Sequence, residues 1–182
     1  MAPLSPTTIL LVDGYNIIGL WSELQYIRDN HGLEPARREL TERLIGYSSF
    51  HGFDTRIIFD SQYHNSRGHR ETVTSHLCLV YTDFGQTADT HIEKACAAIG
   101  RQKTLPKQRT IVATSDRAQQ QVVVGYGAEC ISARQLRSDV DASNSRVRRR
   151  QNTAPKRSQR RLLSSSLDPA SRQRLVQWQR GL

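Results

Sequence analysis

Short apolar runs separated by helical patterns fill the first 140 residues, and this alternation restricts the fold more than any other feature. Strands are predicted at 7–12 ("TTILLV"), 55–60 ("TRIIFD"), 76–82 ("HLCLVYT"), 109–114 ("RTIVAT") and 128–132 ("AECIS"). The runs are continuously apolar, which is typical of strands buried on both faces of a parallel sheet. We therefore expect an α/β fold with a doubly wound, mostly parallel sheet of about five strands and helices on both faces.

The segments between these strands carry helix patterns. Helices are predicted at 34–50, 88–100, 115–125 and 133–140. The first places Leu40, Leu44 and Tyr47 on one face at spacings of four and three, and the second has Thr87 as its N-cap. Together the strands and helices predict a single domain over residues 7–140.

The net charge of +9 comes entirely from the last quarter of the chain. Residues 1–140 contain 15 Lys and Arg against 15 Asp and Glu, whereas residues 141–182 contain 11 Lys and Arg against two acids. The range 141–166 is rich in Ser, Asn, Gln, Pro and Arg, so a basic flexible linker is expected there. A short C-terminal helix is predicted at 167–182, because Asp168 and Pro169 form a strong helix start. A neutral body with a basic extension indicates an acidic partner, most commonly nucleic acid.

Several classes of protein are disfavoured. The three cysteines lack the spacing of a zinc site and are expected to be buried thiols of a reducing compartment. No apolar run approaches the roughly 20 residues of a membrane span, so no membrane partner is expected. The first residues lack the basic segment of a secretory signal. The glycines form neither a P-loop nor a GxGxxG motif. A cytoplasmic protein is the expectation.

Acidic residues follow the predicted strands at one edge of the sheet. Asp13, Asp60 and Asp116 come where strands end, Asp89 lies in the first turn of a helix, and Glu93 is one turn further along that helix. Clustered carboxylates repel one another, and burial raises the cost unless a cation compensates. Oxygen ligands suit Mg²⁺ or Mn²⁺, which can activate water and stabilise the leaving oxygen of a phosphodiester. The set predicts a metal site.

Each of these residues also has an ordinary structural explanation. Asp13 could cap the turn after its strand, Asp116 could be a plain N-cap, and Asp89 suits a helix N-terminus through the dipole. Asn16 could be a turn amide, and Gly14 is expected to let the chain turn sharply after the strand. The metal-site interpretation therefore depends on all the acids falling on the same predicted edge.

Basic side chains supply the expected contacts with RNA. Arg67 and Arg70 lie in a polar loop of about a dozen residues predicted after the second strand, where they could contact phosphates. The basic extension would add salt-sensitive affinity that does not depend on RNA sequence. The expected RNA-binding residues are Arg67, Arg70, Arg117, Arg148, Arg149, Arg150, Lys156, Arg157, Arg160 and Arg161.

Five stretches in order resemble the motifs of the YacP-like branch of the NYN domain family: "ILLVDGYNIIGLW", "RIIFD", "YTDFGQTADTHIEK", "IVATSDRAQQ" and "GAECISARQL". The resemblance covers about residues 8–140, and DGYN and QTAD are its most diagnostic elements. It implies a PIN-like nuclease fold with Asp13, Asp89 and Asp116 as the core metal-binding acids. It places Asn16 near the site and adds Asp60 and Glu93 as further candidate ligands.

The sequence departs from the family in two places. After the second strand the family often has "FDA" and a glycine-rich stretch with acids, whereas this chain has "FDSQYHNSRGHRET". Beyond about residue 141 we find no matching motif. Basic extensions of this kind resemble those of photosynthetic bacterial or plastid relatives, so the plastid stroma is the alternative location.

The expected function is that of a metal-dependent endoribonuclease that cleaves single-stranded RNA. Asp13, Asn16, Asp89 and Asp116 are the expected catalytic residues, and Mg²⁺ or Mn²⁺ is the expected cofactor. The resemblance implies products with a 5′-phosphate and a 3′-hydroxyl, and it makes the ribosome a candidate partner because one YacP-like protein cleaves mRNA there. A non-catalytic RNA- or ribosome-binding protein with a PIN-like body is the alternative. A metal-dependent phosphohydrolase acting on small nucleotides is a further rival that the basic extension disfavours.

Overall fold

A computed structural model gives the fold and describes residues 8–61, 68–102 and 108–153. The chain divides into two compact units, residues 1–147 and 148–182. The strands are β1 (Ile9–Asp13), β2 (Asp54–Phe59), β3 (His69–Thr74), β4 (Leu77–Tyr81), β5 (Thr110–Ala113) and β6 (Glu129–Ile131). The helices are α1 (Gly14–Leu20), α2 (Ser22–His31), α3 (Leu33–His51), α4 (Ala88–Gly100), α5 (Arg117–Gly125) and α6 (Ala133–Thr153).

The strands form one sheet in the order β3-β4-β2-β1-β5-β6. Five strands are parallel, and β3 pairs with β4 in the antiparallel direction. The chain builds outward from β1 through β2 and β4, then crosses to add β5 and β6 on the other side. The strand order therefore reverses between β1 and β5, where doubly wound sheets bind their ligands. The predicted fold class is confirmed.

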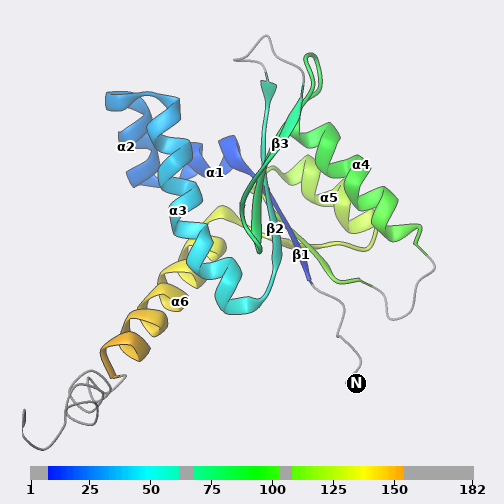
Figure 1. Ribbon diagram of the computed structural model, residues 1–182. Helices are drawn as coiled ribbons and strands as arrows, with labels where there is room; N and C mark the ends of the chain where they lie inside the picture. The colour runs from blue at the N-terminus through cyan, green and yellow to red at the C-terminus, as the bar shows by residue number, and fades with distance from the viewer. Residues whose placement is uncertain (1–7, 62–67, 103–107, 154–182) are drawn as a thin grey trace, which may run out of the picture. The chain divides into compact units, whose positions relative to one another are not determined.

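Helices cover both faces of the sheet (Figure 1). Helices α4 and α5 pack on one face, where they bury Ile9 and Leu11 of β1. Helices α1, α2, α3 and α6 contribute to the core on the other face, where Leu10 and Val12 of the same strand are buried. Because side chains alternate along a strand, Asp13 is directed to the face of α4 and α5, two residues after Leu11.

The edge strand β3 is a correction to the sequence prediction. Its residues fall in what was expected to be a polar loop, so Arg70 lies on a strand. Five of its six residues are exposed, and its sequence "HRETVT" therefore lacks the apolar run by which buried strands were recognised. Charged side chains on an edge strand also discourage pairing with other chains.

Helices α1 and α2 were also missing from the prediction. Helix α1 begins directly at Gly14. The prediction of a sharp turn at this glycine is therefore wrong, because its backbone is helical and not left-handed. A Cβ at Gly14 would lie 2.3 Å from Cε1 of Phe59, which explains the glycine by close packing. Ile17 and Ile18 of α1 are fully buried, and their continuous apolar pattern resembles that of a strand.

Helix α6 corrects the predicted domain boundary at residue 141. The helix continues to Thr153, so residues 141–153 are helical and do not form the expected flexible linker. Within the first unit, Ser143 is buried and its hydroxyl lies 3.1 Å from Nε2 of His51. Arginine is also a good helix former, so an arginine-rich composition does not exclude a helix. The remainder of the linker and the predicted helix at 167–182 lie outside the described residues.

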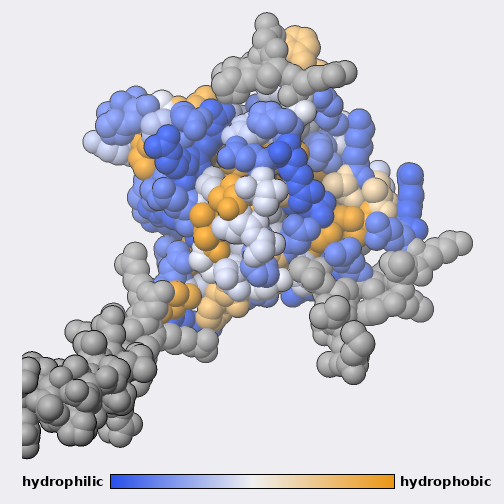
Figure 2. Space-filling model, viewed as in Figure 1, coloured by the Kyte–Doolittle hydropathy of each residue, from blue (hydrophilic) through white to orange (hydrophobic). Residues whose placement is uncertain are grey.

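On the face shown in Figure 2, hydrophobic residues form small separate patches among hydrophilic ones. All three cysteines are free. Cys78 and Cys96 are buried as predicted, whereas Cys130 is only partly buried, so the prediction of a buried thiol is wrong there. In the described ranges, none of the helices combines the length and apolarity needed to cross a membrane.

Candidate active site

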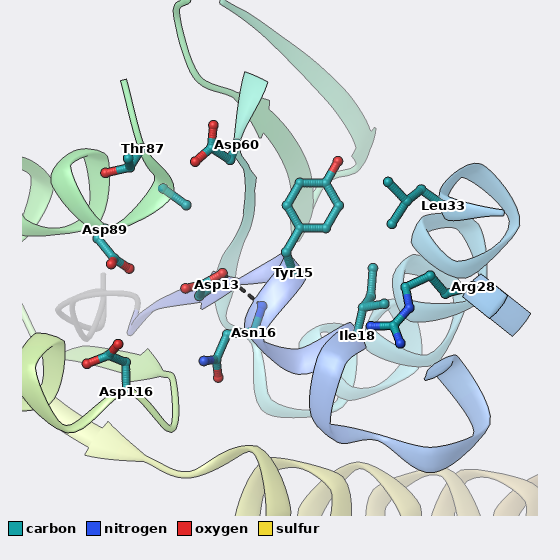
Figure 3. A pocket seen from close by; sticks show the side chains of 11 residues that line it. Asp13, Tyr15, Asn16, Ile18, Arg28, Leu33, Asp60, Thr87, Asp89 and Asp116 are labelled. Carbon is teal, nitrogen blue, oxygen red and sulfur yellow. Dashed lines mark hydrogen bonds between the residues drawn. The ribbon is translucent and has the colours of Figure 1, made fainter. Parts of the chain in front are cut away.

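A pocket of about 480 Å³ opens at the carboxyl ends of the parallel strands. It is lined by Asp13, Tyr15, Asn16, Ile18, Arg28, Leu33, Asp60, Thr87, Ala88, Asp89 and Asp116. We call it the acid pocket, because four predicted carboxylates lie in it (Figure 3). They come from the ends of β1, β2 and β5 and from the first turn of α4.

Asp13 is the buried member of the cluster, with 8% of its surface exposed. Its Oδ1 accepts a hydrogen bond of 3.1 Å from the backbone N–H of Asn16, which caps α1. Burial raises the pKa of Asp13 to about 6, and the charges of Asp89 and Asp116 add to this rise. The carboxylate form of Asp13 is therefore destabilised unless a cation lies nearby.

Asp89 is held at the N-terminus of α4, one residue after the first helical position. Like Asp13, it lines the acid pocket. Its Oδ1 also accepts a bond of 2.6 Å from Nε2 of Gln119, a buried residue of α5. Burial raises the pKa of Asp89, and the charge of Asp116 adds to this rise. Helices α4 and α5 therefore position this side chain.

Asp116 is both the N-cap of a helix and part of the acid pocket. It is the N-cap of α5, and its Oδ1 accepts bonds of 2.8 Å from the N–H of Ala118 and 3.1 Å from that of Gln119. Its side chain also lines the acid pocket. The cap fixes the side chain at the pocket's edge, so the two interpretations do not exclude each other.

Asn16 connects the two central strands. Its Oδ1 accepts a hydrogen bond of 2.9 Å from the backbone N–H of Ser115, directly before Asp116. The hydroxyl of Ser115 in turn accepts a bond of 2.9 Å from the N–H of Ala133. The side-chain oxygen of Asn16 is therefore used to hold the end of β5, and it was missed as a structural link because the partner is 99 residues away.

Of the two additional candidate ligands, Asp60 lines the acid pocket and Glu93 does not. Asp60 lies two residues after the buried Ile58, hence on the same face of the sheet as Asp13, and it lines the acid pocket. Glu93 lies on α4 one turn after Asp89 but does not line the pocket. The prediction that Glu93 shares the site with the four aspartates does not fit this arrangement.

The predicted RNA-binding residues are distributed over several parts of the chain. Arg70 is exposed on β3, and Arg117 is exposed at the first position of α5. Arg148, Arg149 and Arg150 lie on α6, where Arg149 is exposed. The rest lie outside the described residues: Arg67, Lys156, Arg157, Arg160 and Arg161.

Sequence reasoning missed the wall opposite the carboxylates and the contact from α5. Tyr15, Arg28 and Leu33 line that wall, and the hydroxyl of Tyr15 accepts a bond of 3.0 Å from the buried Arg37. The guanidinium of Arg28 pairs with Asp29 at 2.8 Å. Because α1 and α2 were not predicted, these residues could not be placed. Gln119 belongs to the "TSDRAQQ" stretch, and its place one turn after Asp116 was the available indication.

The comparison with known families decides the relationship. The model of the YacP-like NYN domain matches residues 10–180. The chain belongs to this family. The match extends well past residue 141, so the inference that no family pattern continues into the basic extension was wrong.

Relatives of this YacP-like NYN protein are found in Bacillus subtilis. The uncharacterised protein YacP of strain 168 is 36% identical over 143 residues, which cover 78% of this chain and 80% of the relative. The crystal structure of Rae1 (YacP) from the same species has a TM-score of 0.66 at 30% identity, with 96% of each chain covered. A mutant form of Rae1 gives a TM-score of 0.64 at 33% identity over 81% of this chain and 84% of the other. The expected PIN-like nuclease fold is confirmed.

The carboxylate oxygens of the acid pocket are the donor type that a hard divalent cation takes, with part of its coordination left to solvent or substrate. Among the described residues, no three His, Cys, Asp or Glu side chains are close enough together to form a metal cage. Mg²⁺ keeps several waters and is commonly bound through one or two carboxylates plus substrate phosphates. Asp13 and Asp89 both line the pocket and both have raised pKa values, so a cation bound there would stabilise their carboxylate forms.

Proposed function

We propose that this NYN protein is a metal-dependent endoribonuclease that cleaves single-stranded RNA. One observation carries the proposal: the buried Asp13 faces the charges of two further acids, Asp89 and Asp116, at the reversal of strand order. In the part of the chain that the structure describes, no ion pair joins a basic side chain to any of these three acids. A fold that keeps such a cluster has a use for a cation.

The proposed ligands are Asp13, Asp89 and Asp116, which would bind the ion partly through its retained water molecules, with Asp60 at the same pocket as an additional candidate. Mg²⁺ or Mn²⁺ bound there would lower the pKa of a water molecule and stabilise charge on the phosphate oxygens. Neutral groups behind the acids keep them in place. The amide of Gln119 donates to Asp89, and the cap geometry of α5 fixes Asp116.

The chain's own residues then orient the reaction. Burial favours the protonated form of Asp13, so this carboxyl has to lose its proton before it can act as a carboxylate ligand. Asn16 fixes the distance between the two central strand ends through Ser115. Water attacks the phosphodiester in line with the leaving oxygen, which departs as the 3′-hydroxyl and leaves a 5′-phosphate on the other fragment.

RNA is the proposed substrate because the basic charge of the chain lies in a single extension. The 11 Lys and Arg of residues 141–182 would attract the phosphate backbone in a salt-dependent manner. A neutral body with this extension also suits an RNA-rich partner such as the ribosome, which is the proposed setting for cleavage of mRNA.

The alternative is a non-catalytic RNA- or ribosome-binding protein built on the same body. The basic extension suits both functions equally well. The acid pocket favours the enzyme, because a binding protein gains nothing from a buried carboxyl whose pKa is raised to about 6.

The experiment uses the purified full-length chain, a single-stranded RNA of defined sequence and Mn²⁺. Wild type should produce fragments with 5′-phosphate ends, and EDTA should abolish them. The double variant Asp13→Asn with Asp89→Asn should leave the RNA intact while it still binds the RNA. Equal fragment yields from wild type and the double variant would refute the nuclease. Because the ribosome could supply the cleavage-competent state, the same comparison is repeated with ribosomes translating an mRNA.

A further inference from the structure

The connection between β4 and α4 is a tight turn with fixed geometry. The backbone N–H of Gln86 donates to the carbonyl of Asp83 at 2.9 Å, which closes a turn over Phe84 and Gly85. Gly85 has φ of 79°, a left-handed conformation that glycine adopts without strain. The hydroxyl of Thr82 donates to the carbonyl of Gln86 at 2.6 Å. These bonds hold the turn in one conformation.

Neighbouring segments also anchor this turn from outside. The hydroxyl of Ser61 donates to the carbonyl of Asp83 at 2.8 Å, and the N–H of Ser61 donates to Thr82 at 3.0 Å. The N–H of Gly68 donates to Oδ1 of Asp83 at 2.9 Å. A Cβ at Gly68 would lie 2.9 Å from the backbone N of Asp83, so the chain there packs closely against the turn.

The tip of this turn presents an aromatic ring to solvent. Phe84 is 75% exposed, more than any other large hydrophobic side chain that the structure describes. Single exposed apolar residues are common on proteins, so exposure alone says little. A turn fixed by at least five hydrogen bonds, however, holds the backbone of this residue in one place, in the loop that projects beyond the sheet in Figure 1.

The turn separates two hollows of different charge. On one side the acid pocket begins with Thr87 and Asp89. On the other side a cleft of about 340 Å³ contains Arg56, His69, Arg70 and His91, and we call it the basic cleft. The turn contributes Thr82, Asp83 and Gln86 to the basic cleft, and Thr87 directly after it lines the acid pocket, so Phe84 lies on a turn that borders both hollows.

Two arginines line the basic cleft. The guanidinium of Arg56 pairs with Asp54 at 2.7 Å through Nη2, whereas its Nε is buried and has no hydrogen-bond partner among the described residues. Arg70 is exposed and directed into the same cleft from β3. Guanidinium groups bind phosphate oxygens strongly, so the cleft suits a phosphate of a nucleic acid chain.

We propose that Phe84 is a stacking platform for one base of single-stranded RNA, whose chain runs from the acid pocket across the turn into the basic cleft. The inference rests on the proposed function, because it takes RNA as the substrate. Aromatic rings stack on any base, and stacking requires an unpaired base. The ring's neighbours in the turn, Asp83, Gly85 and Gln86, are polar or small, whereas the core of a protein interface is enriched in apolar and aromatic residues. A base is therefore the better occupant.

The test measures RNA binding by the full-length chain in EDTA, so that no cleavage occurs. The probe is a fluorescent single-stranded 12-nucleotide RNA, together with a series that carries one abasic site at each position. Phe84→Ala should weaken binding about 5- to 150-fold, in line with the loss of one stacked base. Phe84→Trp should restore it. Tyr126→Ala is the matched control, because Tyr126 is 45% exposed just after the C-terminus of α5 and lines neither hollow.

The abasic series separates stacking from a structural effect. If the inference holds, one abasic position weakens wild type about as much as Phe84→Ala does and has little further effect in that variant. Unchanged binding by Phe84→Ala, or a loss that is the same at every abasic position, overturns the inference. If Phe84→Ala keeps RNA binding but loses ribosome binding, Phe84 contacts a protein and the inference of a stacking platform is overturned.

The proposed function and this inference can be refuted separately. A chain that binds RNA through Phe84 but cleaves nothing with Mn²⁺ refutes the nuclease and keeps the stacking platform. A chain that cleaves RNA while Phe84→Ala binds and cleaves like wild type refutes the platform alone.

Discussion

The side-chain oxygen of Asn16 accepts a hydrogen bond from the backbone N–H of Ser115 at 2.9 Å, and this bond joins the ends of β1 and β5. The backbone N–H of Asn16 also donates to Asp13, and Ser115 directly precedes Asp116. One residue therefore sets the relative position of two acids that are far apart in the sequence. Its role is to position the site, whether or not it contacts RNA.

Replacing Asn16 should therefore affect both stability and catalysis. Asn16→Ala leaves the N–H of Ser115 without its acceptor, and we expect a loss of about 1–3 kcal/mol in the free energy of unfolding. We expect kcat to fall about 10- to 100-fold, since groups that orient metal ligands have effects of this size. Urea unfolding and steady-state cleavage measure the two effects. Asn30→Ala, in which an exposed amide on α2 is lost, is the control and should change neither.

The two glycines of α1 give a matched pair for packing. Gly14→Ala brings a methyl group within 2.3 Å of a carbon of Phe59, which is fully buried and cannot move aside. We expect a destabilisation of about 1–3 kcal/mol from this overpacking. Gly19→Ala meets nothing within 4 Å and should stabilise the helix by up to about 1 kcal/mol. Equal effects of the two substitutions on urea unfolding would contradict the packing explanation.

The sequence predicted the elements whose burial leaves a periodic or continuous apolar pattern. The five parallel strands and helices α3, α4 and α5 fall within a few residues of their predicted ranges. The edge strand β3 is exposed on both faces, and α2 buries only Leu24, so neither leaves such a pattern. The extent of α6 depends on packing against α3 through Ser143, a long-range contact that composition does not encode.

The same limit applies to the site. Asp13, Asp60, Asp89 and Asp116 could be placed at one edge because parallel strands end on the same side of a sheet. The helical spacing of four that joined Glu93 to Asp89 does not bring Glu93 into the pocket, since only the first turn of α4 reaches it. The contacts of Asn16 and Gln119 cross between elements, so local spacing could not predict them.

The stability of the cation-free protein should fall as pH rises from about 4 to 6. The pKa of Asp13 is about 6 in the folded state, against 3.8 for the ordinary value, so the folded state binds more protons than the unfolded state in this window. Its ionisation therefore opposes folding, by about 3 kcal/mol once complete. Urea unfolding in EDTA at pH 4 to 7 measures the slope.

Two variants test whether Asp13 causes this dependence of stability on pH. Asp13→Asn should flatten the pH dependence and be more stable than wild type at pH 7, whereas Asp141→Asn, at an exposed site, should follow wild type. Saturating Mn²⁺ should restore the stability of wild type at pH 7. A stability difference between wild type and Asp13→Asn that stays constant across the window would contradict a buried carboxyl with a raised pKa.

Gln119 offers a test that separates positioning from folding. Its Nε2 donates to Asp89, whereas its Oε1 is buried and has no hydrogen-bond partner among the described residues. Gln119→Met keeps the volume and removes both polar atoms, so we expect little loss of stability. Mn²⁺ affinity, measured by calorimetry, should fall about 10- to 100-fold. Gln121→Met, on the exposed face of α5, should leave it unchanged. A large loss of stability with unchanged Mn²⁺ affinity would show that Gln119 acts in folding alone.

The most direct test of the acid pocket compares two carboxylates one turn apart on α4. Asp89 lines the pocket and Glu93 does not, although both were predicted ligands. The measurement is the rate of Mn²⁺-dependent cleavage of single-stranded RNA by wild type, Asp89→Asn and Glu93→Gln at saturating enzyme. We expect the cleavage rate to fall at least about 100-fold in Asp89→Asn and to change less than about threefold in Glu93→Gln. Equal rates for all three proteins, or a greater loss in Glu93→Gln than in Asp89→Asn, would contradict this expectation.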